Sequence, residues 1–394
     1  MAKEILEGSR AVARAVAMCR PQVIAAYPIT PQTHIVQELA QLVADGELAA
    51  EYVNVESEHS AASVILGASA AGVRVYTSTT SQGMLLMNEV LYNLAGLRLP
   101  AVMTCVNRAV SAPLNIWNDH QDSISVRDSG WMQFYAENNQ EAVDLLLQAY
   151  RLAEDHRVLL PAMVCMDGYI LSHAWEVVDI PTPAAVDTFL PPYPPLYRLD
   201  TENPLTFGAY AEPDKYTETR YMMQEAMNRA LEVLPEIQAD FARIFGRRYQ
   251  GPVEGYRLED AETVFIGMGS TMGTVKEAVD ALRQQGEKVG AVRLIAYRPF
   301  PAQALYAALQ RVRQAIIFDR AVSLGSGGPL ATEVRALFQS APDCPAISSG
   351  FLGLGGRDVT EETVINAYAQ TRGRTVQGIF FDLRHDVEME GVEG

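Results

Sequence analysis

Short β-prone apolar runs alternate with helical segments along the first half of the chain. The predicted strands cover residues 22–27, 52–55, 73–77, 101–106 and 158–165. Each is followed by a segment long enough to cross back over a sheet, and parallel strands require such crossovers. The pattern therefore predicts a doubly wound parallel sheet of an α/β fold. Residues 5–19 are predicted to form a helix that precedes the first strand.

The pattern changes after residue 180 and predicts a division of the chain. Residues 1–180 form the first α/β domain, and residues 181–255 form a Pro-rich linker followed by a long helix that Pro235 interrupts. We expect this linker to wrap over the surface or over a partner. Strands and helices then alternate again and predict a second α/β domain at 256–380, followed by an acidic tail at 381–394.

Composition limits the classes of function. Apolar residues make up 48% of the 394 residues, which permits a large core, and the net charge of −17 argues against a nucleic-acid partner. No run of about 18 apolar residues is present, so no membrane span is expected. The amino-terminal residues lack an apolar signal region, which favours the cytoplasm. The four cysteines form no closely spaced pair, so we expect no metal site on this chain, and any electron-transfer cluster would lie on another.

Glu58 is the first candidate functional residue. It stands between the predicted strand at 52–55 and a helix of small residues, at the edge where open α/β sheets place their ligands. Small side chains let a flat cofactor approach the backbone closely. The alternative is that Glu58 only favours the start of a helix, where a carboxylate meets the positive end of the helix dipole.

Two further candidates follow neighbouring strands. Thr30 lies in a turn held rigid by Pro28 and Pro31, where its hydroxyl and free backbone N–H groups could face an anion. Arg108 follows the strand at 101–106, where a guanidinium could hold a carboxylate. The alternatives are an ordinary loop for Thr30 and a surface salt bridge for Arg108. A long polar loop at 111–130 is expected to be functional or disordered.

Five motifs occur in one order along the chain. They are Tyr27-Pro28-Ile29-Thr30-Pro31, Glu58-His59-Ser60, Thr80-Ser81-Gln82-Gly83, Asn107-Arg108-Ala109 and Asn118-Asp119-His120-Gln121-Asp122. Together they closely resemble the α subunits of pyruvate:ferredoxin oxidoreductases, within the 2-oxoacid:ferredoxin oxidoreductase family, over about residues 5–380. The resemblance implies a thiamine-diphosphate-binding pyrimidine-type fold followed by a transketolase-C-terminal-like domain.

The resemblance also implies an activity shared among several subunits. A 2-oxoacid is decarboxylated on thiamine diphosphate, an acyl-CoA is made from CoA, and electrons pass through iron–sulfur clusters to ferredoxin. The implied partners are β, γ and δ subunits. The cofactor's diphosphate and Mg²⁺ are expected on the β subunit, and [4Fe–4S] clusters on partner subunits. The present chain would then supply the pyrimidine side of the cofactor site and no metal ligand.

Individual roles follow from the resemblance position by position. Glu58 is the implied catalytic residue because it corresponds to the glutamate that hydrogen-bonds the aminopyrimidine of the cofactor. Arg108 is implied to bind the carboxylate of the 2-oxoacid, and Thr30 its oxygens. The implied cofactor-binding residues are Tyr27, Pro28, Ile29, Glu58, Gln82 and Asn118. A threonine at position 30, rather than a second arginine, favours a small, singly charged substrate, with pyruvate first. The alternatives are 2-oxobutyrate, a branched-chain 2-oxoacid, 2-oxoglutarate, or a non-catalytic scaffold.

Overall fold

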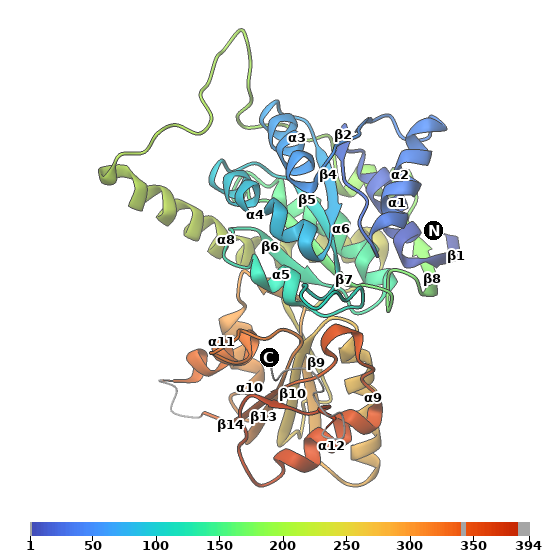
Figure 1. The fold of residues 1–394 in the computed structure, drawn as a ribbon, viewed down its shortest axis with the longest axis vertical. Coiled ribbons are helices and arrows are strands. Elements are labelled where there is room, and N and C mark those ends of the chain that lie inside the picture. The colour runs from blue at the N-terminus through green and yellow to red at the C-terminus, as the bar shows by residue number, and fades with distance from the viewer. Residues whose placement is uncertain (1, 340–343, 385–394) are drawn as a thin grey trace, which may run out of the picture.

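The computed structural model describes residues 2–339 and 344–384. The chain forms two α/β halves, drawn one above the other in Figure 1, and each half has its own sheet. The expected acidic tail at 381–394 lies outside the described residues except for its first four positions. None of the described helices has the length and apolar character that crossing a membrane requires.

The amino-terminal half is built on a seven-stranded sheet. Its strands lie in the order β12 (Ala296–Arg298), β6 (Met132–Tyr135), β7 (Ala162–Asp167), β5 (Val102–Asn107), β4 (Val75–Thr79), β2 (Val23–Ala25) and β3 (Glu51–Val53). All neighbouring strands are parallel except β12, which runs antiparallel to β6. β4, β5 and β7 are buried along their whole length, as expected for parallel strands covered on both faces. The predicted doubly wound sheet is confirmed.

Helices cover both faces of this sheet. They are α1 (Gly8–Cys19), α2 (Thr33–Ala44), α3 (Glu58–Ala70), α4 (Ser81–Gly96) and α6 (Asn139–Ala153), with the short α5 (Gln121–Ser125) beside α4. Buried side chains of α1, α2 and α6 form one apolar core, and those of α3 and α4 form the other. Helices α3 and α4 therefore pack against each other on one face of the sheet, and the candidate site lies where these two helices begin.

The predicted helix at 5–19 is wrong at its beginning. Residues Ala2–Glu7 form strand β1, which pairs antiparallel with β8 (Trp175–Ile180), and helix α1 starts only at Gly8. Ile5 is largely exposed on this two-stranded ribbon. Because the partner strand lies far along the chain, local sequence pattern does not show the pairing.

The linker contains more helix than its proline content suggests. After α7 (Pro183–Phe189) the chain first runs along the first half, where the backbone of Pro191, Pro194 and Leu199 hydrogen-bonds Arg74, His156 and Ala70. It then loops away from the body and returns as the long helix α8 (Pro213–Phe245), whose first turns project in Figure 1. The predicted interruption at Pro235 is wrong, because α8 runs through it. Val233, Leu234 and Ile237 are buried in the first core around this position, and their packing offsets the backbone hydrogen bond that proline removes.

The carboxyl-terminal half has a six-stranded sheet. Its order is β15 (Ile379–Phe380), β14 (Ala346–Phe351), β13 (Gln314–Asp319), β10 (Thr263–Met268), β11 (Val289–Leu294) and β9 (Val253–Tyr256), with β9 antiparallel. The helices of this half are α9 (Thr271–Gln284), α10 (Ala302–Leu309), α11 (Pro329–Phe338) and α12 (Glu361–Thr371), with a 3₁₀ turn at Leu354–Gly356. The predicted second α/β domain is confirmed. The division at 1–180, 181–255 and 256–380 stays a prediction, and β12 joins the first sheet from the last of these ranges.

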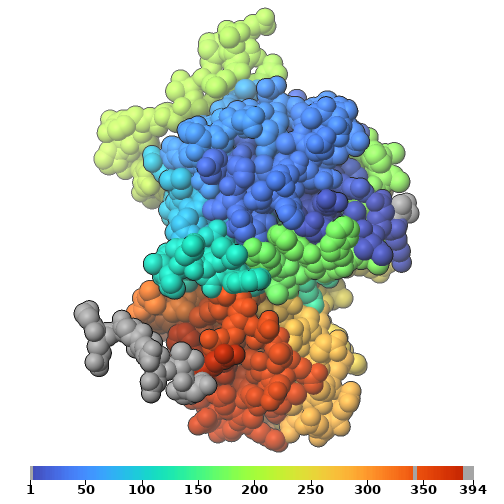
Figure 2. All heavy atoms as spheres, turned by 45° about the vertical axis from the view of Figure 1, so that its right-hand side comes forward, coloured from blue at the N-terminus to red at the C-terminus, as the bar shows by residue number. Residues whose placement is uncertain are grey.

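A buried charge cluster joins the two halves at the boundary seen in Figure 2, where teal and green segments meet orange and red ones. Asp167, at the end of β7, accepts hydrogen bonds from Arg320 Nη1 at 3.0 Å, from the Ser270 N–H at 2.9 Å and from the Ser270 hydroxyl. His120 Nε2 lies 2.9 Å from its other oxygen. Burial alone would raise the pKa of Asp167, but the charges of Arg320 and His120 and the hydrogen bonds outweigh it and hold that pKa well below its usual range.

Candidate active site

The carboxyl ends of β2, β4 and β5 lie next to one another because these strands are neighbours in the sheet. The turn at 27–31 follows β2, Thr80 follows β4, and Arg108 follows β5. The edge strand β3 leads into α3, which packs against α4, β4 and β2. Four segments that carry candidate residues therefore meet at one edge of the sheet, the usual ligand edge of an open α/β fold.

Glu58 begins helix α3 and its side chain turns inward. Ser57 caps the helix by accepting a hydrogen bond from the Ser60 N–H at 3.2 Å, so Glu58 is not needed as the cap. Glu58 is only 6% exposed, and across residues 2–339 and 344–384 no hydrogen bond or ion pair is formed by its carboxylate. A buried, unpaired carboxylate is costly, which indicates a donor supplied from outside this chain.

Gly83 makes the space that the Glu58 carboxylate occupies. A Cβ atom at this position of α4 would lie 2.6 Å from Glu58 Oε1 and 2.5 Å from Thr79 Oγ1. Both distances are far below an ordinary contact. The Thr80-Ser81-Gln82-Gly83 motif therefore includes its glycine because the side chains of α3 and β4 fill the volume beside it.

Two buried hydroxyl groups lie at the same edge. Thr79 Oγ1 and Thr80 Oγ1, at the end of β4, have no hydrogen-bond partner within the described part of the chain. Buried polar atoms in native proteins are nearly always paired, so these two hydroxyls are exceptions to the usual pattern. Both threonines are 0% exposed and Glu58 is 6% exposed, so a ligand at this edge would contact Glu58 rather than these hydroxyls.

The turn that follows β2 is held in place by a buried side chain, that of Gln32. Its members are at or near the surface: Tyr27, Pro28 and Thr30 are exposed and Ile29 is half-buried. The buried Gln32 donates from Nε2 to the Ser78 carbonyl at 2.9 Å and accepts from the Ile29 N–H at 3.3 Å. Gln32 thus ties the turn to β4. This role is not predicted from the sequence, in which the polar residue directly after Pro31 is the one available signal.

The Arg108 side chain contacts the backbone of Thr30 rather than its side chain. Its Nη1 donates to the Thr30 carbonyl oxygen at 2.8 Å and its Nε donates to the Asn115 carbonyl at 2.9 Å. Arg108 is 6% exposed and forms no salt bridge within the described residues, so the surface-ion-pair alternative is wrong. Burial lowers its pKa, partly opposed by Asp122 and Tyr169. Nη2 forms no hydrogen bond with the part of the chain that the structure describes, so it can donate to a ligand.

Asp122 joins the ends of β4 and β5. Its Oδ2 accepts from the Ser81 N–H at 2.9 Å and the Arg108 N–H at 3.0 Å. Its Oδ1 accepts from Asn107 Nδ2 at 2.8 Å and the Ser123 N–H at 2.7 Å. Burial raises the pKa of Asp122 to about 6 although these donors oppose the shift. The polar loop is therefore ordered around Asp122, a role that the run of polar residues indicated only loosely.

The contacts of Gln82 and Asn118 within the described residues are with groups other than Glu58. Gln82 Nε2 donates to the Ser111 carbonyl at 3.3 Å, which links α4 to the loop after β5. With its amide oxygen turned toward Arg320, Asn118 accepts from both Nη atoms at 3.1 and 2.7 Å. Asn118 thus lies at the boundary between the halves. The cofactor contacts implied for these two residues stay predictions.

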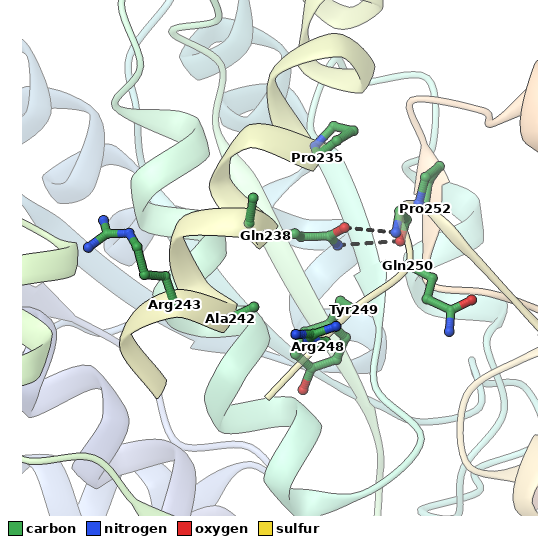
Figure 3. A pocket seen from close by; sticks show the side chains of 10 residues that line it. Pro235, Gln238, Ala242, Arg243, Arg248, Tyr249, Gln250 and Pro252 are labelled. Atoms are coloured by element: carbon green, nitrogen blue, oxygen red, sulfur yellow. Dashed lines mark hydrogen bonds between the residues drawn. The ribbon is translucent and has the colours of Figure 1, made fainter. Parts of the chain in front are cut away.

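A separate hollow of about 710 Å³ lies between α8 and the segment that follows it (Figure 3). Gln238 spans it by two hydrogen bonds to the backbone of Gly251, at 2.8 and 3.3 Å. It is lined by Pro235, Gln238, Ala239, Ala242, Arg243, Arg248, Tyr249, Gln250, Gly251 and Pro252. None of the residues implied for catalysis or binding lines this hollow, so it adds nothing to the candidate site.

Two family models match most of the chain. The model described as pyruvate flavodoxin/ferredoxin oxidoreductase, thiamine diphosphate-binding, matches residues 14–239. The model of pyruvate:ferredoxin oxidoreductase core domain II matches residues 261–364. The two matches follow the two α/β halves in order.

Known relatives are similar over nearly their full length. Pyruvate synthase subunit PorA of Methanosarcina barkeri is 48% identical over 97% of this chain and 97% of its own length. The same subunit of Pyrococcus furiosus is 48% identical, covering 91% and 90%. Ketoisovalerate oxidoreductase subunit VorA of Pyrococcus abyssi is 47% identical, covering 92% and 91%.

Solved structures support the fold. A 2-oxoglutarate:ferredoxin oxidoreductase from Magnetococcus marinus, with 2-oxoglutarate, coenzyme A and succinyl-CoA bound, aligns with a TM-score of 0.73 at 20% identity. The alignment covers 93% of this chain and 65% of that one, so the present chain spans about two thirds of its length. A split-gene transketolase aligns with a TM-score of 0.56 at 12% identity, covering 93% and 97%. Both confirm the expected fold class.

Proposed function

The chain belongs to the pyruvate:ferredoxin oxidoreductase family, and on that premise we propose that it is the α subunit of a thiamine-diphosphate-dependent, CoA-acylating 2-oxoacid:ferredoxin oxidoreductase. The reaction is the reversible oxidative decarboxylation of pyruvate to acetyl-CoA and CO₂, with electrons passed to ferredoxin. The observation that carries the proposal is the buried Glu58 carboxylate, which has no partner within the described residues and lies at the ligand edge of the first sheet.

Glu58 is the residue of this chain that would contact the reactive part of the cofactor. Thiamine diphosphate, when bound, supplies the electron sink for decarboxylation. The Glu58 carboxylate would share a proton with a pyrimidine ring nitrogen, and Gly83 leaves it the room to do so. Tyr27, Pro28, Ile29 and Gln82 are proposed to line this edge.

Arg108 and Thr30 are proposed to bind the 2-oxoacid. Two backbone carbonyls hold the Arg108 guanidinium in one orientation, and Nη2 remains available to donate to the substrate carboxylate. Thr30 is exposed at the same turn, where its hydroxyl can reach substrate oxygens. The pair suits a small acid with one negative charge.

The rest of the machinery is proposed to lie on other chains. The relatives are named as subunits, which supports assembly with β, γ and δ subunits. We place the diphosphate and Mg²⁺ on the β subunit, [4Fe–4S] clusters on partner subunits, and the complex in the cytoplasm. The chain alone should then show no turnover of pyruvate, whereas the complex purified with its partners should be active.

A branched-chain 2-oxoacid is the second candidate substrate. The ketoisovalerate relative is 47% identical to this chain, almost as similar as the pyruvate relatives at 48%. Turnover of the purified complex with pyruvate and with 2-oxoisovalerate, under the same CoA and ferredoxin concentrations, separates the two. We expect the higher kcat/KM for pyruvate, and the reverse order would assign the branched acid.

Arg108→Ala should raise the KM for pyruvate by at least about 30-fold with a smaller change in kcat, because it removes a charge-assisted contact of ~2–5 kcal/mol. Initial rates of the assembled complex over a range of pyruvate concentrations measure both constants. Arg98→Ala is the matched control, since Arg98 likewise holds two backbone carbonyls: its Nε donates to Leu159 and its Nη2 donates to Val158. An unchanged KM in Arg108→Ala would remove Arg108 from the substrate site.

Gly83→Ala should lower kcat/KM by about 10²-fold, because the new methyl group meets the Glu58 carboxylate and displaces it. The measurement is turnover of the assembled complex, with thermal unfolding recorded in parallel. Gly96→Ala lies in the same helix with nothing within 4 Å of the added Cβ, and we expect it to leave activity unchanged. Equal activity in both variants would mean that the position of Glu58 does not matter.

A further inference from the structure

Three side chains outside the candidate site converge from distant parts of the chain. Glu7 ends β1, His34 lies in the first turn of α2, and His173 lies in the turn between β7 and β8. One ligand atom from each lies within 4.8 Å of those of the other two. His34 Nδ1 is 2.6 Å from Glu7 Oε1, and the rings of His34 and His173 have centroids 4.7 Å apart.

The surroundings prepare His173 to act as a ligand. Its Nδ1 lies 2.7 Å from Ser172 Oγ, which also accepts the Tyr169 N–H at 2.8 Å. With Nδ1–H donating to that hydroxyl oxygen, Nε2 keeps its lone pair. An outer hydrogen bond of this kind orients most metal-binding histidines.

The cluster is open to ions from one side. The side chain of His34 is 46% exposed while that of Glu7 is 8% exposed. A hollow of about 230 Å³ has His34 and His173 in its wall, together with Thr30, Pro31, Thr33 and Gln37. The Arg10 Nε lies 3.8 Å from the other carboxylate oxygen of Glu7, so Glu7 Oε1 remains directed at His34. The arrangement thus combines a buried anchor, two imidazoles and an entry path.

We propose that Glu7, His34 and His173 form a binding site for a divalent transition-metal cation of the Zn²⁺ class. Two histidines and one glutamate are a known zinc donor set, and solvent completes the four positions. Tetrahedral donors at about 2.0 Å from zinc lie about 3.3 Å apart, so ligand atoms that now lie within 4.8 Å of one another would have to approach by up to about 1.5 Å. The inference does not depend on the proposed catalytic function.

Such a site would link three segments next to the substrate turn. A bound cation would tie the end of β1 and the turn after β7 to the first turn of α2, which follows directly on Thr30 and Pro31. The carbonyl of Thr30 in turn holds Arg108. Metal occupancy would therefore restrain the turn that carries Thr30.

Calorimetric titration of the full-length chain with Zn²⁺ tests the proposal. We expect one saturable site per chain, and affinity reduced in Glu7→Gln and in His173→Asn by more than the ~10–100-fold that loss of an outer-shell partner costs. His156→Asn and Cys344→Ser are the controls, because His156 is a surface imidazole bonded to Pro194 and Cys344 is an exposed thiol. Both controls should bind Zn²⁺ as the parent chain does.

The visible absorption of Co²⁺ added to the parent chain gives a readout that needs no variant. A spectrum of nitrogen and oxygen ligation in low coordination number supports the site. Absence of saturable binding by the parent chain overturns the proposal. So does binding that is lost in Cys344→Ser, or binding that survives unchanged in folded Glu7→Gln and His173→Asn.

Discussion

Replacing Glu58 by Gln should lower kcat of the assembled complex with pyruvate by about 10²–10⁴-fold, the range that a positioned proton-transfer group contributes. Glutamine has the size of glutamate and fits the space beside Gly83, so the variant keeps the packing of α3 on α4. It can no longer take up or release a proton at the edge of the cofactor ring. The measurement is CoA-dependent reduction of ferredoxin by the complex.

Glu56→Gln is the matched control for this prediction. Glu56 stands two residues earlier, is exposed, and accepts a hydrogen bond from the Ser60 hydroxyl. It should keep the parent rate. Thiamine content and subunit composition of both complexes show whether assembly is intact. A fully assembled Glu58→Gln complex that turns over pyruvate at the parent rate would favour the non-catalytic scaffold and contradict the role of Glu58.

Replacing Arg320 by Met should lower the free energy of unfolding by about 3–5 kcal/mol, the cost of removing one partner of a buried ion pair. Arg320 is 5% exposed and Asp167 is 1% exposed at their side chains. The variant leaves Asp167 buried beside His120 and also removes the donor of the Gly353 carbonyl, which Arg320 Nη2 contacts at 3.2 Å. Equilibrium denaturation of the full chain measures the change.

Arg313→Met is the control for the second prediction. Arg313 pairs with Glu262, but its side chain is 80% exposed, and exposed pairs contribute only about 0–1 kcal/mol. If Arg320→Met lowers the free energy of unfolding no more than Arg313→Met does, the Asp167–Arg320 cluster does not hold the halves together.

The pH dependence of the free energy of unfolding gives a second test of the Asp167–Arg320 cluster. Because the pKa of Asp167 is held below its usual value, its contribution to stability is present above about pH 4 and is lost as pH falls further. Arg320→Met weakens this effect. The parent chain should therefore lose more stability than the variant on acidification below about pH 4.

The sequence by itself determined the fold class and the sheet edge that carries the site. Alternating strands and helices predicted the parallel sheet because the core periodicity of each element is local. Glu58, Thr30 and Arg108 were identified because each follows a strand, and parallel strands bring their carboxyl ends together. The sequence also shows a glycine at position 83, but it does not show that the Glu58 and Thr79 side chains leave no room for a larger residue there.

Only the tertiary structure decided which groups touch. Whether Glu58 lacks a partner, whether Arg108 holds the carbonyl of Thr30, and whether Asp122 joins two strand ends depend on side chains far apart in sequence. The same holds for the β1–β8 ribbon, for β12 in the first sheet and for the convergence of Glu7, His34 and His173. Local patterns record burial and turn chemistry, whereas a contact between distant segments is set by how whole elements pack.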